Sequence, residues 1–401
     1  MGRVIALDAG PGEEEAVHLE NVAVRVIKSL ESISSDAWDQ LDHGGAPFLS
    51  YGFLRALEVS GSVGPEAGWD PRYLLIEDTD GIAGAVAAYV KTDSYGEYIF
   101  DWAWANASQR AGIPYYPKLV VAAPFTPATG PRILIRLGSD KPKLRKALVE
   151  AVQELSIEEK CHSTHWLFVT EEEREALKTA GFALRDSFQF HWRNKGYSDF
   201  EEFISAFTSR KRKQCRKERR RAREAVDEID FVKGADLTAA MLKELDTFYR
   251  INVARHGGFD YLRPGFFEAL VEFCPEKVLF ARAHRENRAI AGAFFLEDSR
   301  GLYGRYWGAL EKADCLHFEV AYYAAIERCI NQGVSLFEAG AQGEHKLLRG
   351  FEPAPTYSAH LLSHEPIDRA VRQFLMAESK EVKRRMEELA SYGPYRQSET
   401  F

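Results

Sequence analysis

The chain has 401 residues, of which 45% are hydrophobic and 28% charged, and its formal net charge is −8. This length predicts two or three domains at roughly 100–200 residues each, and no apolar run approaches the roughly 18–20 residues of a membrane span, which excludes an integral membrane protein. Five widely spaced cysteines argue against a disulfide framework and against a zinc site, so no bound metal is expected.

The first segment of the chain, residues 1–21, is acidic and is predicted to be a disordered tail. Asp8 and Glu13 stand where a secretory signal peptide needs a basic head and an apolar middle. We therefore expect a cytoplasmic protein.

An internal repeat organises the rest of the chain. The tetrapeptide Ile-Ala-Gly-Ala at 82–85 recurs at 290–293, and the pattern Tyr-Gly-x-Tyr at 95–98 recurs at 303–306 with the same spacing. A third, looser match is Gly-Phe-Leu-Arg-Ala-Leu at 52–57, upstream of the first tetrapeptide, and Gly-Phe-Phe-Glu-Ala-Leu at 265–270, upstream of the second. Three matches in the same order indicate that one structural unit occurs twice.

The two copies are expected to contain the same elements in the same order. Each has an amphipathic helix, a short helix, three strands of which the third carries Tyr-Gly-x-Tyr, a long helix and two further strands. The first copy is assigned to residues 22–195 and the second to 231–401, with a basic helical connector over 196–230 and a final helix from Pro366. This pattern predicts an α/β fold of two tandem units, each a mixed sheet flanked by helices.

Aromatic and acidic residues mix in the first copy. Tyr95, Glu97, Asp101 and Trp102 suggest a cleft for a flat or cationic group, although aromatic runs are also typical of a core. A Pro-rich loop follows, placed between a strand and a helix, where backbone N–H groups can bind a phosphate. The candidate residues in that loop are Thr126, Thr129, Gly130 and Arg132. A rigid connector is the alternative interpretation of this loop.

Polar residues follow three consecutive elements of the second copy, where strand ends of α/β sheets commonly bind ligands. No P-loop, dinucleotide, zinc-protease or nucleophile-elbow motif is present. The candidate substrate-binding residues are Arg305, Tyr306, Trp307, His317, Glu319, Glu338, Gln342 and Arg349. The densest segment continues with Glu344, His345 and Lys346.

The connector is strongly basic, with ten Lys or Arg between residues 210 and 223 against a single Glu. Such a run is often a solvated helix face, but it also fits a phosphate backbone. The candidate nucleic-acid contacts are Arg210, Lys211, Arg212, Lys213, Arg216, Lys217, Arg219 and Arg220.

Six segments resemble a known family, and they read SYGEYIFDWAWA, YYPKL, PFTPATGPR, LYGRYWG, LHFE and EAGAQGEHKLLRG. With the duplication and the basic arm, they are similar to the FemAB-like, tandem GNAT proteins over about residues 48–362. The resemblance implies two GNAT-like domains and transfer of an acyl group from a thioester or ester to an amine. It also implies a reactive Lys beside an aromatic residue late in the second unit. Lys346 matches that Lys, but its neighbour here is His345.

The resemblance leaves the acyl donor open. Fem-type relatives use aminoacyl-tRNA and extend a peptidoglycan bridge, whereas other GNAT enzymes use acyl-CoA. Residues 129–132 are only a weak match to a pyrophosphate signature, so aminoacyl-tRNA is favoured as a co-substrate, with no tightly bound cofactor. The acceptor would be an amine on a small molecule or a peptidoglycan precursor. A non-catalytic module that recognises a glycan or peptide is the third hypothesis.

For the transfer itself we expect Glu344 or His345 to act as the base and Lys346 to stabilise the oxyanion. Arg305 and Arg349 would bind anionic groups of the donor.

Overall fold

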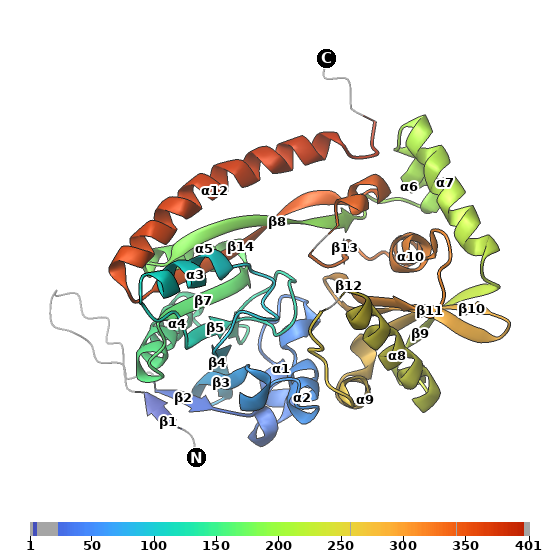
Figure 1. The fold of residues 1–401 in the computed structure, drawn as a ribbon. Helices are drawn as coiled ribbons and strands as arrows, with labels where there is room; N and C mark the ends of the chain where they lie inside the picture. Colours follow the sequence, from blue (N-terminus) through green and yellow to red (C-terminus); the bar gives the residue numbers. More distant parts are fainter. Residues whose placement is uncertain (1–2, 6–22, 257, 342, 397–401) are drawn as a thin grey trace. The chain divides into compact units, whose positions relative to one another are not determined.

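The structure is a computed structural model and describes residues 3–5, 23–256, 258–341 and 343–396. By its internal contacts the chain divides into two compact units (Figure 1). Unit 1 comprises residues 1–44, 48–187 and 356–380, and unit 2 comprises residues 45–47, 188–355 and 381–401. The segment expected as a connector, 196–230, is part of unit 2, and the segment 356–380 returns to unit 1. Of the expected tail, residues 3–5 form a strand, and 6–21 lie outside the described residues.

Unit 1 is built on a mixed sheet in the order β1-β2-β3-β4-β5-β7-β14, with β6 beside β4. Its neighbouring strands are antiparallel except β5 and β7, which are parallel. Its strands are β1 (Arg3–Ile5), β2 (Val24–Ile27), β3 (Asp70–Asp78), β4 (Gly81–Lys91), β5 (Lys118–Val121), β6 (Ile133–Ile135), β7 (Ser163–Val169) and the part of β14 (Glu352–Leu362) from Thr356 onwards. Its helices are α1 (Ser35–Asp39), α2 (Tyr51–Val59), α3 (Trp102–Arg110), α4 (Lys141–Glu158), α5 (Glu171–Thr179) and the first part of α12 (Glu365–Ser391).

In unit 2 the described strands follow the order β8-β13-β12-β11-β10-β9, and the one parallel pair among them is β12 with β13. Its strands are the part of β8 (Ala183–Arg193) from Phe188 onwards, β9 (Glu228–Lys233), β10 (Val278–Arg285), β11 (Arg288–Asp298), β12 (Gly301–Ala309) and β13 (Leu336–Glu338). Its helices are α6 (Phe200–Ser205), α7 (Ser209–Glu224), α8 (Ala239–His256), α9 (Phe266–Phe273), α10 (Leu316–Phe318), a π-helical turn (Glu319–Tyr323), α11 (Ala324–Asn331) and a 3₁₀ turn (Glu344–Arg349).

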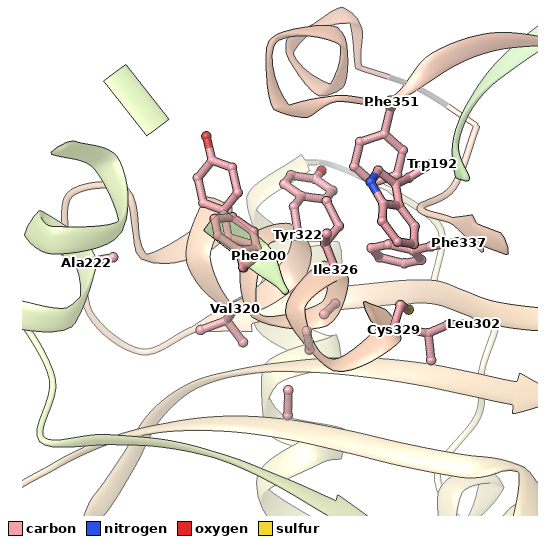
Figure 2. Close-up of a cluster of buried hydrophobic side chains, with 14 of the residues drawn as sticks. Trp192, Phe200, Ala222, Leu302, Val320, Tyr322, Ile326, Cys329, Phe337 and Phe351 are labelled. Carbon is pink, nitrogen blue, oxygen red and sulfur yellow. The ribbon is translucent and has the colours of Figure 1, made fainter. Parts of the chain in front are cut away.

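Strand alternation explains why helices cover both faces of the unit 2 sheet. Along β11, Ala293 and Phe295 belong to the cluster formed with the π-helical turn and α11, while Phe294 between them contacts Phe267 of α9. Figure 2 shows this cluster around Tyr322, Ile326 and Phe337. On the other face, α8 lies so close to the sheet that a Cβ on Gly308 would fall 2.0 Å from the carbonyl oxygen of Phe248, so only glycine fits there.

The third strand of the first copy is an incorrect prediction. In unit 2 the Tyr-Gly-x-Tyr pattern lies within β12, but Tyr95–Tyr98 of unit 1 is a turn, and β5 pairs with β4 instead. Gly96 and Tyr98 have positive φ, and the indole of Trp69 and the amine of Lys91 both donate to the Tyr95 carbonyl. These contacts fold the backbone out of an extended conformation. The predicted α/β class with mixed, helix-flanked sheets is confirmed.

Candidate functional site

The parallel strands β12 and β13 separate almost as soon as they meet. In the described chain they pair only at Leu302 with Phe337 and at Tyr303 with Glu338. Beyond these pairs β12 continues to Ala309, whereas the chain after Glu338 turns away at Gly340, which has a φ of 81°. The two strands thus leave an opening where their polar backbone groups are not used by each other.

The opening is continuous with a cavity of about 380 Å³ in unit 2. The register between β11 and β12 shifts so that Tyr306 faces Phe294 and Gly304 faces Phe295, which makes Arg305 the extra residue of a bulge. A bulge re-aims the side chain that it carries, and Arg305 lines the cavity. Four of the predicted residues line it together: Arg305, Tyr306, Trp307 and His317.

Helix α8 and the π-helical turn complete the cavity wall with residues that the sequence patterns did not indicate. Asn252 and Arg255 lie on the last turns of α8, and Tyr322 lies in the π-helical turn. Arg255 and Arg305 make this wall electropositive, which suits an anionic group on a ligand. Nothing in the local sequence of α8 distinguishes these two residues from ordinary exposed helix positions.

Lys346 is buried at the foot of the opening. It lies in the 3₁₀ turn after β13, is 2% exposed, and its Nζ donates to the carbonyl of Gly340 at 2.7 Å. Burial, with the nearby charge of Arg305, lowers the pKa of Lys346 to about 7. The side chain therefore exchanges its proton near neutral pH, where an exposed lysine stays charged.

His345 and Glu344 differ in their surroundings. The His345 ring lies 3.1 Å from the hydroxyl of Tyr322 through Nε2, and partial burial together with Arg349 and Lys346 lowers its pKa to about 4. His345 is therefore neutral at pH 7 and can accept a proton. Glu344 is exposed and pairs with Arg385 at 2.7 Å.

The other predicted residues of the second copy are placed as follows. Arg349 is buried, with its guanidinium carbon 3.3 Å from the centre of the Phe318 ring, and donates to Glu218 and to the carbonyl of His345. Glu319 is fully buried and binds Arg219 and Arg223. Glu338 is buried beside Tyr303 and 3.9 Å from His191. Gln342 lies outside the described residues.

The acidic residues of the first copy point into unit 1 and bind a buried lysine. Lys118 Nζ donates to Glu97 at 2.8 Å, to Asp101 at 2.6 Å and to Ser94 at 2.7 Å. Although burial opposes charge, the two carboxylates raise the pKa of Lys118 above its usual value. Desolvation raises the pKa of Glu97 to about 7, while Lys118 holds that of Asp101 down at about 2 against the effect of burial.

The aromatic residues of the first copy are the sequence neighbours of cluster members, Tyr95 of Ser94 and Trp102 of Asp101, but they are partly exposed. Tyr95 and Trp102 are 40% and 37% exposed, with ring centres 5.0 Å apart. The Pro-rich loop leads into β6 rather than a helix, which corrects the expected position, and the N–H groups of Arg132 and Ile133 donate to Glu173. The Arg132 guanidinium is buried and donates to nearby backbone carbonyls.

The same loop contains the other three candidate residues for donor binding. Thr126 Oγ1 donates to the carbonyl of Pro124, Thr129 follows in the same stretch, and the N–H of Gly130 donates to the carbonyl of Phe168. A role for these residues in binding the donor stays a prediction.

The basic helix α7 (Ser209–Glu224) uses part of its charge within unit 2. Arg219 pairs with Glu319 and with Glu327, at 3.0 and 2.5 Å, and only 13% of its side chain is exposed. Arg216 pairs with Glu201 on the surface. Of the eight predicted contacts, the exposed side chains are those of Arg210, Lys213, Arg216, Lys217 and Arg220, while Lys211, Arg212 and Arg219 are partly buried.

Among the residues that the structure describes, no group of three His, Cys, Asp or Glu side chains could hold a metal ion. No helix among the same residues is long and apolar enough to cross a membrane.

A comparison with curated proteins gives no match. Among solved structures, FemX is 12% identical, with a TM-score of 0.52 over 84% of this chain and 97% of FemX, which supports the same fold. The L-PGS of Bacillus licheniformis is 14% identical over 83% of this chain and 94% of its own, with a TM-score of 0.49. A tandem GNAT protein from the clavulanic acid biosynthesis pathway is 9% identical over 85% of this chain and 99% of its own, with a TM-score of 0.44.

A family model for peptidoglycan biosynthesis and recognition proteins, named FemAB-like, matches residues 29–397. This match covers nearly the whole chain and confirms the resemblance found in its motifs. The fold agrees, since FemX has the same arrangement over most of both chains. The chain therefore belongs to the FemAB-like family of peptidoglycan biosynthesis and recognition proteins.

Proposed function

We propose that this protein transfers an aminoacyl group from aminoacyl-tRNA to an amine of a peptidoglycan precursor, and that the reaction takes place at the opening between β12 and β13. The observation that carries this proposal is Lys346, a lysine that is 2% exposed beside the opening and whose pKa is about 7. Perturbed titratable groups at a cavity are typical of reactive sites.

The proposed reaction forms a C–N bond and breaks a C–O ester bond. The acceptor amine attacks the ester carbonyl, and the proton that it loses passes to His345, which is neutral at pH 7 because its pKa is about 4. The ester oxygen then leaves as the ribose hydroxyl of the tRNA and takes up that proton. Lys346 in its protonated form donates a hydrogen bond to the oxyanion of the tetrahedral intermediate.

Positive charge at the cavity and on α7 supports aminoacyl-tRNA as the donor. Arg305 and Arg255 both line the cavity, where they can bind the phosphate next to the aminoacylated ribose. The exposed residues of α7, namely Arg210, Lys213, Lys217 and Arg220, would bind phosphates farther along the tRNA.

A thermal-shift experiment separates this donor from acyl-CoA. Deacylated tRNA should raise the melting temperature of the protein, and this effect should weaken steeply with salt and with Lys213→Gln/Lys217→Gln/Arg220→Gln. Stabilisation by CoA and not by tRNA would instead favour an acyl-CoA donor.

The acceptor is tested by product formation. The protein, charged tRNA and a peptidoglycan-precursor peptide with a free amine should give a peptide that is one aminoacyl group heavier by mass spectrometry. If this peptide binds but is not modified with either class of donor, a recognition module without catalysis is the better explanation.

A further inference from the structure

The basic helix α7 has two different faces. Its inner face contains Cys215 and Ala222, which are 2% and 0% exposed, and between them Glu218 and Arg219. Its outer face contains the exposed lysines and arginines. Glu218 is the one acidic residue within the basic run of 210–223, and its side chain is only 14% exposed. A helix whose basic residues are simply solvated does not require a buried carboxylate at this position.

Glu218 accepts hydrogen bonds from the π-helical turn, from the 3₁₀ turn Glu344–Arg349 and from its own helix. Its Oε2 accepts from the Tyr323 hydroxyl at 2.7 Å and from Arg349 Nη2 at 3.0 Å, and its Oε1 accepts from Gln214 at 3.0 Å. The carboxylate side chain is only 14% exposed and that of Arg349 only 4%. Because little water reaches this charge-assisted bond, it holds α7 and the 3₁₀ turn Glu344–Arg349 firmly together.

Arg349 connects Glu218 to the 3₁₀ turn that carries His345 and Lys346, which we call the reactive turn. Its Nη1 donates to the carbonyl of His345 at 2.6 Å, and its guanidinium stacks on Phe318, 3.3 Å from the ring centre. The hydrogen bond lies within the 3₁₀ turn Glu344–Arg349, which also carries Lys346, and the stacking joins this turn to α10. If Glu218 were missing, the buried charge of Arg349 would have lost its counter-ion, and such charges are expelled toward water.

A second set of ion pairs joins α7 to the π-helical turn, which forms part of the cavity wall. Arg219 and Arg223 both bind Glu319 and Glu327, and Glu319 begins the π-helical turn that carries Tyr322. Tyr322 lines the cavity and contacts His345. Helix α7 thus holds both the reactive turn and the cavity wall, and π-helical turns are frequent at functional sites.

We propose that Glu218 is a positioning residue of the transfer site, which holds Arg349 and through it the turn that presents His345 and Lys346. The role rests on the proposed function, because it takes Lys346 as the reactive lysine. In this arrangement the helix that contacts the donor with its outer face orients the reacting groups with its inner face.

The first test measures the pKa of Lys346 by NMR in protein labelled with ¹³C-lysine, with the signal assigned by its loss in Lys346→Met. Lys346 faces Arg305 on β12, His191 on β8 and His345 on its own turn. Loosening of the turn would admit water and leave these groups in place. Glu218→Ala should therefore raise the pKa of Lys346 by roughly one unit from about 7, in the direction of an exposed lysine.

Two further variants keep this test decisive. Glu218→Gln retains an acceptor of the same shape and should show a smaller rise, so it still gives a result if Glu218→Ala does not fold. Glu224→Ala is the matched control, because Glu224 lies on the same helix, is 66% exposed and pairs with Arg220 on the surface. It should leave the pKa of Lys346 unchanged. A folded Glu218→Ala protein with the wild-type pKa would overturn the proposal.

The second test separates this inference from the choice of donor. With charged tRNA, Glu218→Ala should lower kcat by about ten-fold with KM nearly constant, since misplacement of reacting groups acts on the chemical step. Lys217→Gln/Arg220→Gln should do the reverse and raise KM. If tRNA is neither bound nor used, the proposed donor is wrong, but the NMR result still decides the role of Glu218. Equal kcat in Glu218→Ala and wild type would contradict that role.

Discussion

Lys118 of unit 1 and Lys346 of unit 2 are both buried, but their partners differ. Lys118 is 0% exposed and donates to two carboxylates, which hold its pKa above the usual value. Lys346 is 2% exposed and donates to a carbonyl, and in the described part of the chain no carboxylate pairs with it, so its pKa falls to about 7. The same side chain is therefore a fixed structural charge in one unit and a titrating group in the other.

The parallel strand pairs around these lysines show the same contrast. In unit 1, β5 and β7 pair over four consecutive residues, and beyond them Gly130 and Arg132 donate to carbonyls of Phe168 and Leu167. In unit 2, β12 and β13 pair at only two positions and then open onto the cavity. In unit 1 the carbonyls of β7 beyond the paired residues accept bonds from the chain itself, and this difference supports the proposal that the chemistry takes place in unit 2.

The largest expected effect is the loss of transferase activity when Lys346 is replaced. Lys346→Met should reduce kcat by about 10³-fold, the loss expected when an oxyanion donor is removed. The measurement is release of labelled amino acid from charged tRNA to the acceptor peptide. Lys346→Arg keeps the positive charge and serves as a control: it should retain more activity than Lys346→Met at every pH. Wild-type turnover by Lys346→Met would remove the basis of the proposed function.

The next effect separates the lysines by stability. Lys118→Met leaves Asp101 buried without its cation and Glu97 with only the more distant Lys91 at 3.9 Å, and such a change costs about 3–5 kcal/mol. Urea unfolding should show this loss as a lower midpoint with an unchanged slope. A triple variant that also converts Glu97 and Asp101 to Gln and Asn should recover most of the loss. If Lys118→Met is as stable as wild type, the cluster does not carry the charges described here.

A third prediction concerns pH and the buried histidines of unit 1. His165 and His360 share a bond of 2.7 Å between their Nδ1 atoms, and burial lowers the pKa of His165 to about 3 and that of His360 well below its usual value. The unfolded chain takes up these protons near pH 6.5, so their contribution to stability is complete above that pH and is lost as pH falls toward 3. Each histidine contributes a slope of about 1.4 kcal/mol per pH unit in this window.

Unfolding free energies measured between pH 4 and 7 test this slope. His165→Gln/His360→Gln should lower it, although His191 and His345, whose pKa values are also lowered, will keep part of it. An unaltered slope in the double variant would show that the pair titrates normally.

The smallest expected effect is a gain in stability. The pKa of Lys346 is lowered, so the folded protein bears the cost of a buried charge in full below pH 7, and this cost disappears as pH rises from 7 to 10.5. Relative to wild type, Lys346→Met should therefore be more stable at pH 6.5 than at pH 9.5, as is common where function requires a strained group. Thermal melts at the two pH values compare the proteins, and an equal difference at both would contradict the assigned pKa.

Much of the fold could be predicted because it follows from local patterns. The apolar face of Phe200, Phe203 and Phe207 is buried, and the repeated Ile-Ala-Gly-Ala segments both lie in central strands. The expected terminal helix is present, and its apolar residues Val371 and Leu375 are buried, but Phe374 beside them is 47% exposed. An amphipathic pattern indicates a helix more reliably than it indicates which of its border residues is covered.

The site was predictable only where its residues are close in sequence. Arg305, Tyr306 and Trp307 follow one another on β12, and their gathering at a cavity could be expected. The contact of Glu218 with Arg349 joins residues 131 positions apart, and no spacing rule indicates it. Likewise, the pairing of Lys118 with Glu97 and Asp101 could not be predicted. It depends on the turn at 95–98, which the repeat pattern predicts as a strand.

The measurement that decides most is the titration of Lys346 itself. In wild-type protein labelled with ¹³C-lysine, the signal that disappears in Lys346→Met should titrate with a midpoint near pH 7, more than three units below the reference value of 10.5. A midpoint close to 10 would mean that this amine is hydrated and ordinary, and the assignment of the reaction to the opening beside it would have to be abandoned.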